Sequence, residues 1–137
     1  MENSSREHKL RVSVKGLFYN IEGEVLLVHG KSGDFWCAPG GGVEEGESMI
    51  GALRRELLEE TGNIGEPENV VFVQEYGLSD GSKQIEIFFR GGIIGKSSES
   101  EPDHEWRFFN KENLSKEKFL PEGLDPFDLQ DGSRCTI

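Results

Sequence analysis

The chain has 137 residues and a mass of 15.3 kDa, so we expect one domain with its own hydrophobic core over residues 1–137. It carries 26 Asp and Glu against 15 Lys and Arg, which gives a formal net charge of -11 and a pI near 4.7. This balance excludes the basic surface that nucleic acid polymers and anionic membranes require of a partner. Two cysteines, an N-terminus unlike a signal peptide and no apolar run of ~18 residues lead us to expect a cytoplasmic protein.

The elements predicted along the chain are mostly strands, with one clear helix. We expect residues 1–9 to be disordered and the tail over 121–137 to be irregular. In chain order, the segments between them are strands over 10–20 and 25–28, a glycine-rich loop over 30–42, a helix over 48–61, strands over 70–76 and 84–90, an acidic loop over 91–103, a strand over 106–109 and a short helix within 110–119. The strands outnumber the helices, and the main helix lies between strands in the sequence. This order predicts an α+β or α/β class with a mixed sheet.

The helix over 48–61 has clear signals at both ends. Ser48 is a suitable N-cap and Gly62 a suitable C-terminal stop. Ile50, Leu53 and Leu57 recur at the helical period and form one apolar stripe. We therefore expect this helix to pack against the sheet along that stripe.

Three carboxylates lie along one edge of that helix. At about 100° per residue, Glu56, Glu59 and Glu60 fall within an arc of roughly 100°, where like charges repel by about 0.2–0.5 kcal/mol per pair. One interpretation is a solvated acidic face in which Arg55 offsets Glu59. The other is a site for a hard cation such as Mg²⁺, which prefers oxygen ligands. The glycine-rich segment over 39–47 favours the cation site, because it lets backbone groups approach a ligand closely.

The glycine segment and the acidic helix together match a known spacing. The chain resembles the Nudix hydrolases, whose signature is G-x5-E-x7-R-E-U-x-E-E-x-G-U, with U a bulky apolar residue. The fixed positions are filled here by Gly41, Glu47, Arg55, Glu56, Leu57, Glu59, Glu60 and Gly62. Asn63 stands at the last apolar position, with Ile64 one step later, and this departure concerns packing after the helix. The match covers residues 41–63, and flanking segments extend the likeness to about 10–120.

The resemblance implies a fold and an activity. The fold would be an α/β/α sandwich of the α+β class, with a mixed β-sheet and the motif as a catalytic loop-helix-loop. The activity would be hydrolysis of a nucleoside diphosphate linked to another group X, in which water attacks phosphorus. The products would be a nucleoside monophosphate and phospho-X, or pyrophosphate from a triphosphate. The cofactor would be Mg²⁺ or Mn²⁺.

The resemblance also implies a metal-binding set. The ligands would be Glu56, Glu59 and Glu60, joined by the backbone carbonyl of Gly40. Arg55 would orient these carboxylates through a salt bridge.

The general base remains open among four acidic residues. Glu56 serves in some members of the family, whereas others use an acidic residue on a later loop, for which the candidates are Glu99, Glu101 and Glu105. We favour Glu101, because it stands five residues before Trp106.

The substrate-binding residues and the partners are predicted from position. Trp36 stands beside the glycine segment and could stack on a base, while Gly41 and Gly42 would let the backbone approach the substrate. We expect a small nucleotide as partner, no nucleic acid polymer and no membrane, and we leave a homodimer open.

Two other functions compete with the hydrolase. A Nudix-fold nucleotide-binding or regulatory module without turnover is the first, although such modules often lose the carboxylates that this chain keeps. An isomerase acting on a prenyl diphosphate is the second, and it would need an added Cys and Glu in a longer chain.

Overall fold

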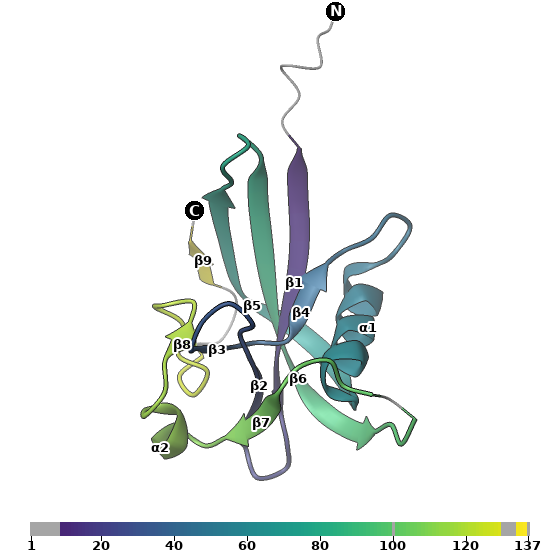
Figure 1. Cartoon of the computed structure of the whole chain (residues 1–137), viewed down its shortest axis with the longest axis vertical. Coiled ribbons are helices and arrows are strands. Elements are labelled where there is room, and N and C mark those ends of the chain that lie inside the picture. Colours follow the sequence, from purple (N-terminus) through teal and green to yellow (C-terminus); the bar gives the residue numbers. More distant parts are fainter. Residues whose placement is uncertain (1–8, 100, 130–133, 137) are drawn as a thin grey trace, which may run out of the picture.

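One mixed β-sheet organises residues 9–99, 101–129 and 134–136, which the computed structural model describes (Figure 1). In chain order the elements are β1 (Leu10–Tyr19), β2 (Val25–His29), β3 (Trp36–Cys37), β4 (Gly40–Gly42), α1 (Met49–Thr61), β5 (Asn63–Gly77), β6 (Lys83–Lys96), β7 (Trp106–Phe109), α2 (Lys111–Leu114), β8 (Phe119–Leu120) and β9 (Arg134–Thr136). The strand order is β8-β3-β2-β1-β6-β5-β9, with β4 paired to β1 and β7 to β2. Of the helices in these residues, none is long and apolar enough to cross a membrane.

Strand β1 is the centre of this arrangement, because it pairs in both directions. It forms the predicted hairpin with β2 and runs parallel to β6 from Leu10↔Lys83 to Tyr19↔Gly92. It also pairs antiparallel with β4, where Lys15 lies opposite Gly40. The mixed sheet predicted from the sequence is therefore confirmed.

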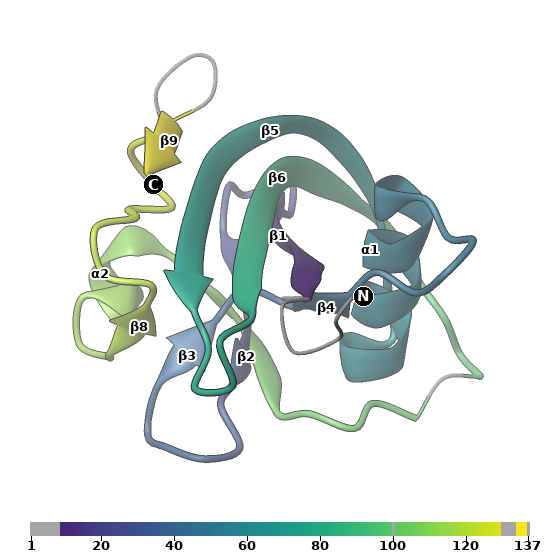
Figure 2. The same ribbon diagram turned by 90° about the horizontal axis from the view of Figure 1, so that it is seen from above.

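The two faces of the sheet carry separate cores, as alternation along a strand requires. In β2, Leu26 points to one face, and Val25 and Leu27 point to the other. The helix-face core consists of Val14, Phe18, Leu26, Ala52, Leu53, Leu57 and Phe89. The far-face core consists of Leu17, Val25, Leu27, Trp36, Ala38, Val71, Phe72, Phe88, Phe109, Leu114 and Leu124. Figure 2 shows α1 on one side of β1, and α2 and β8 on the other, which confirms the sandwich of the α+β class.

Helix α1 forms as the sequence predicts. The Ser48 hydroxyl accepts a hydrogen bond of 2.9 Å from the Gly51 N–H, and the helix ends at Gly62 with a φ of 75°. Leu53 and Leu57 are fully buried against the sheet. Their burial fixes which edge of the helix turns away from the core, and therefore where its carboxylates point.

The glycine-rich segment over 30–42, predicted to be a loop, contains the strands β3 and β4. Gly40 has a φ of 153°, and a Cβ built on it would lie 2.0 Å from the carbonyl oxygen of Val14. A glycine is therefore required for β4 to pair with β1. A run of glycines usually indicates a turn. Here the glycines of β4 instead allow two strands to pair closely.

The acidic loop predicted over 91–103 is wrong in its first part. Strand β6 continues to Lys96, because β5 begins at Asn63 and pairs along its length. A Cβ built on Gly91 would lie 2.3 Å from the carbonyl oxygen of Glu66, so the glycine permits the close approach of the two strands. Figure 2 shows β5 and β6 curving together across β1.

The C-terminal segments also differ from expectation. The helix predicted within 110–119 is limited to Lys111–Leu114, because the following residues lead into β8, which pairs in parallel with β3. The tail over 121–137, predicted to be irregular, contains β9, which pairs in parallel with β5. Of residues 1–9, predicted to be disordered, residues 1–8 lie outside the described residues, and the carbonyl oxygen of Lys9 accepts from the Lys83 N–H at 3.1 Å.

Candidate active site

The site begins where β4 runs beside α1. A Cβ built on Gly41 would lie 2.5 Å from Oε2 of Glu56, so the Glu56 carboxylate occupies the space that a side chain would fill. The backbone N–H of Gly40 donates a hydrogen bond of 3.2 Å to Oε1 of Glu60. The glycine strand and two of the predicted metal ligands are thus in direct contact.

Arg55 holds the carboxylates around one guanidinium group. Its Nε and Nη2 donate to the two oxygens of Glu47 at 2.6 and 3.0 Å. Its Nη1 donates to Glu56 Oε2 at 3.2 Å and to Glu59 Oε1 at 3.3 Å. Its Nη2 also reaches the carbonyl oxygen of Gly42 at 3.3 Å. The fork of donors therefore joins Gly42 at the end of β4 and Glu47 in the following loop to two helix positions, Glu56 and Glu59.

The charges of this network stabilise one another. The hydrogen bond from Arg55 and the backbone N–H of Glu44 lower the pKa of Glu47 from 4.5 to about 2. The Glu47 carboxylate in turn raises the pKa of Arg55 above its ordinary value. Both groups are therefore charged across the neutral range, and the loop is tied to the helix there.

Glu60 stands in a different environment. It is 7% exposed and accepts from Gly40, and its carboxyl group is hydrogen-bonded to that of Glu56. Burial, followed by this contact with Glu56, raises the pKa of Glu60 from 4.5 to about 8. A second negative charge is thus unfavourable at this position, unless a cation is close by.

These residues fit a hard divalent cation by their chemistry. The candidate donors are carboxylate and carbonyl oxygens, and the Glu56–Glu60 pair is buried where an added positive charge would relieve repulsion. Within the residues that the structure describes, no three His, Cys, Asp or Glu side chains are arranged to hold a metal as they stand. The Glu59 side chain is half-exposed and bonded to Arg55, so it would need to turn to join the other two.

The acidic loop before β7 brings two of the candidate bases close to the helix. Glu99 and Glu101 line a hollow of about 470 Å³ together with Glu59. The backbone N–H of Asp103 donates to the carbonyl oxygen of Glu59 at 3.3 Å, which ties this loop to α1.

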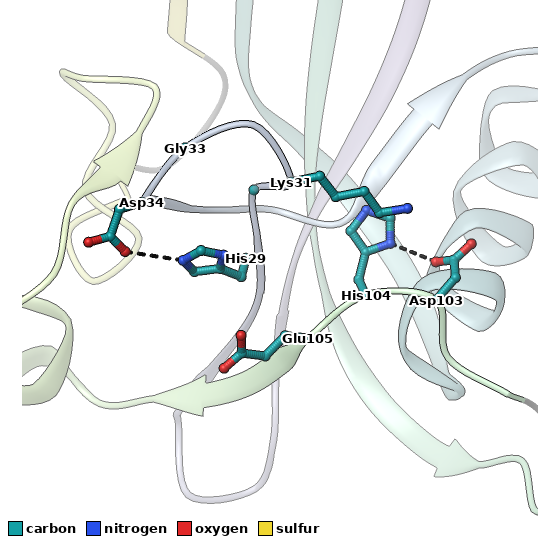
Figure 3. Close-up of a pocket in the computed structure, with 8 residues that line it drawn as sticks. His29, Lys31, Gly33, Asp34, Asp103, His104 and Glu105 are labelled. Atoms are coloured by element: carbon teal, nitrogen blue, oxygen red, sulfur yellow. Dashed lines mark hydrogen bonds and ion pairs between the residues drawn. The ribbon is translucent and has the colours of Figure 1, made fainter.

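Glu105 lies apart from that hollow. It lines another pocket, shown in Figure 3, in which His29 pairs with Asp34 at 3.2 Å and His104 with Asp103 at 2.6 Å. Of the loop candidates, Glu99 and Glu101 therefore share a hollow with Glu59, one of the three helix carboxylates, and Glu105 does not.

Trp36 is also not brought to the carboxylates. Its side chain is 3% exposed in the far-face core, and its ring packs against Phe109 at 4.8 Å. Its Nε1 donates to Glu117 at 3.3 Å. The ring therefore has no open face for the base stacking that its sequence position suggested.

A pocket that the sequence did not indicate lies on the far face, beside β4. It has a volume of about 480 Å³ and is lined by Lys15, Phe35, Cys37, Ala38, Gln74, Tyr76, Glu86, Phe88, Leu120 and Pro121. The alternation of polar residues within 70–76 and 84–90 shows which side chains share a face, but it does not show which strands meet.

We predict that the Glu47→Gln variant is destabilised at neutral pH and that this loss fades in acid. The folded-state pKa of Glu47 is lowered to about 2, so its stabilising effect is present above pH 4.5 and is lost as the pH falls toward 2. Denaturant unfolding of parent and variant along a pH series measures the difference in free energy. Glu45→Gln is the control, because Glu45 is exposed and forms no ion pair with any described residue. A difference for Glu47→Gln that stays constant with pH contradicts the prediction.

Two groups of named proteins are similar to this chain. The chain is 33% identical over 97 residues to 8-oxo-dGDP phosphatase NUDT18 of Homo sapiens, a match that covers 66% of this chain and 29% of that protein. The chain thus spans less than a third of that relative's length. It is 31% identical over 134 residues to an RNA pyrophosphohydrolase of Wolbachia pipientis subsp. Culex pipiens, and 80% of each is covered.

Solved structures show the same fold. A MutT protein from Methanosarcina mazei Go1 superimposes with a TM-score of 0.65 at 29% identity, covering 84% of this chain and 87% of the other. A NUDIX hydrolase from Nitrosomonas europaea superimposes with a TM-score of 0.68 at 25% identity, covering 80% and 78%. The model of the NUDIX domain matches residues 9–129, and the chain therefore belongs to the Nudix family.

Proposed function

We propose that the protein hydrolyses a nucleoside diphosphate linked to X, such as a nucleoside triphosphate or nucleotide sugar, with the help of Mg²⁺ or Mn²⁺. The observation that carries the proposal is that Glu56 and Glu60 lie against the glycine strand, while Arg55 is bonded to Glu56 and Glu59. Membership of the Nudix family supports the same reaction class.

Glu56, Glu59, Glu60 and the Gly40 carbonyl would hold the metal. A divalent ion supplies positive charge to the phosphate oxygens and lowers the pKa of water. The added positive charge matters here, because residues 41–60 contain six Glu against two Arg. Without a cation, these carboxylates would repel a diphosphate.

Arg55 is a positioning residue in this proposal. Its side chain is 26% exposed and is bonded to three carboxylates and to the Gly42 carbonyl, so little of it is left to contact a phosphate. It keeps Glu56 beside Gly41 and the loop over 42–47 against the helix.

Glu101 is the general base that we favour, with Glu56 and Glu99 as alternatives. Glu56 is already bonded to Arg55 and Glu60, whereas Glu101 is exposed and faces the hollow beside Glu59. A base must reach a water near the phosphate, and a carboxylate on the rim of the hollow that bonds no other described residue meets that requirement.

The small nucleotide is the first substrate class and the 5′ end of an RNA is the second. The relative from Wolbachia is named an RNA pyrophosphohydrolase, and the match covers 80% of each protein. The net charge of -11 favours the small nucleotide, because an RNA chain adds phosphates that this surface repels. The name of the human relative specifies a nucleoside diphosphate, in line with the first class.

Turnover of a nucleotide panel tests the proposal. We expect the parent protein to hydrolyse at least one of the nucleoside triphosphates, diphosphates or nucleotide sugars with Mg²⁺ or Mn²⁺, and to lose that activity with EDTA. Glu59→Gln is expected to lower kcat/KM by at least about tenfold, because it weakens the metal-binding set. Including a 5′-triphosphorylated RNA separates the two substrate classes. A parent protein without turnover favours the nucleotide-binding module, and equal activity of Glu59→Gln rejects the metal role.

The Glu101→Gln variant tests the general base. Loss of a general base lowers kcat by about 10²- to 10⁴-fold, while substrate binding changes little. We expect that loss for Glu101→Gln and smaller losses for Glu99→Gln and Glu105→Gln, measured on the best substrate of the panel. If only Glu99→Gln or only Glu56→Gln shows this large loss of kcat, that residue is the general base instead.

The Gly41→Ala variant tests the contact between β4 and the helix. The added methyl group would lie 2.5 Å from Glu56 Oε2 and must displace that carboxylate. Because a displacement of about 1 Å can cost about 10²-fold in rate, we expect a loss of that order in kcat/KM. Gly77→Ala at the end of β5 is the matched control, since a Cβ there meets no atom within 4 Å. Equal activity of the two variants would show that the Glu56 position is not critical.

A further inference from the structure

The pocket on the far face opens beside the candidate metal site. Lys15 lines this pocket, and its Cα is paired with that of Gly40 across β1 and β4. A Cβ built on Gly40 would lie 2.9 Å from Cδ of Lys15, and the backbone N–H of Gly40 donates to Glu60, so both side chains lie against Gly40. A ligand whose phosphates lie at the carboxylates therefore has its remaining part next to Lys15, at the mouth of the pocket.

The pocket and the carboxylates are linked by a second residue. The Cys37 thiol lines the pocket, and its pKa is raised first by burial and then by both Glu60 and Glu86. Glu60 belongs to the helix site, whereas Glu86 lies on β6 within the pocket.

Glu86 is held in position by two neighbours on β5. Its Oε1 accepts from Gln74 Nε2 at 2.8 Å, and its Oε2 accepts from the Tyr76 hydroxyl at 3.3 Å. A carboxylate oxygen has two acceptor directions, so each oxygen keeps one for a ligand. Glu86 is half-buried in the pocket that Phe35 and Tyr76 also line, and these two partly exposed rings offer apolar surface to a planar base.

A fixed carboxylate distinguishes nucleobases by their donors. Guanine presents two adjacent donors, N1–H and the N2 amino group, which match the two oxygens of a carboxylate. Adenine and cytosine each place an acceptor nitrogen beside one amino group, and uracil places its single N–H between two carbonyl oxygens. A carboxylate therefore attracts the two donors of guanine. It repels the acceptor atoms that adenine, cytosine and uracil present on the same edge.

We propose that Glu86, positioned by Gln74 and Tyr76, binds the N1–H and N2 amino group of a guanine base and makes the protein selective for guanine nucleotides. The proposal rests on the proposed function for where the phosphates lie. It concerns the base, so it can be measured by binding of nucleoside monophosphates, which have no phosphoanhydride bond to hydrolyse.

Calorimetric titration of the parent protein with GMP, IMP and AMP in MgCl₂ is the test. IMP retains N1–H but lacks the N2 amino group. A good bidentate contact contributes about 1–3 kcal/mol of discrimination, so we expect GMP to bind about 5- to 150-fold more tightly than AMP, with IMP between them. We expect Glu86→Gln to weaken GMP binding by a similar factor and to bind GMP and IMP almost equally.

Glu75→Gln is the matched control variant. Glu75 lies on β5 between Gln74 and Tyr76, is outside the pocket lining, and pairs with Lys83 at 4.0 Å. This substitution makes the same chemical change and is expected to leave the GMP, IMP and AMP affinities as in the parent protein.

Two results overturn the inference and leave the proposed function standing. In the first, the parent protein binds IMP or AMP as tightly as GMP. In the second, Glu86→Gln weakens the binding of all three ligands equally. The first needs no variant, so it applies even if Glu86→Gln fails to fold. Selective GMP binding that depends on Glu86, in a protein that hydrolyses no nucleotide, supports the inference and rejects the proposed function.

Discussion

The guanidinium group of Arg55 is the interaction on which the rest of the site depends. Glu47, Glu56 and Glu59 all accept hydrogen bonds from it, and Glu44 lies within 3.8 Å. Four carboxylates in one small region repel one another, and a single planar cation with five N–H donors offsets that repulsion in a fixed geometry. Lysine carries the same charge without the fork, so it could not bind both oxygens of Glu47 and still reach Glu56.

The carboxylates are also fixed from the opposite side, by the absence of side chains on β4. Gly40 and Gly41 bring the backbone against Glu60 and Glu56, and Gly40 allows β4 to pair with β1. Two constraints therefore meet at Oε2 of Glu56, which accepts from Arg55 and lies against the backbone of Gly41. The Glu56 carboxylate is thus preorganised to bind a ligand, although the neighbouring carboxylates repel it.

The sequence predicted helix α1 and its buried face because their determinants are local. The spacing of Ser48, Leu53, Leu57 and Gly62 sets the helix and its buried face, and the positions of the three carboxylates follow from it. The parallel pairing of β1 with β6 joins segments some 70 residues apart, and alternation within each strand specifies a face but not a partner. The far-face pocket depends on this pairing, so Lys15 and Glu86 could not be placed together. Composition also misled at Gly91, where close strand pairing looks like a turn.

The proposed arrangement divides chemistry and selection between the two faces of one sheet. The phosphates would meet the carboxylates of α1, whereas the base would meet Glu86 on β6, and the two parts adjoin where Lys15 lies opposite Gly40. Arg55 makes its hydrogen bonds to α1 and to the loop after β4, and Glu86 is bonded to β5. Because these two networks share no side chain, a substitution at Glu86 can change which base is bound while the geometry around Glu56 is retained. The sheet itself supplies the fixed distance between them, since paired β1 and β6 cannot slide without exchanging their buried faces.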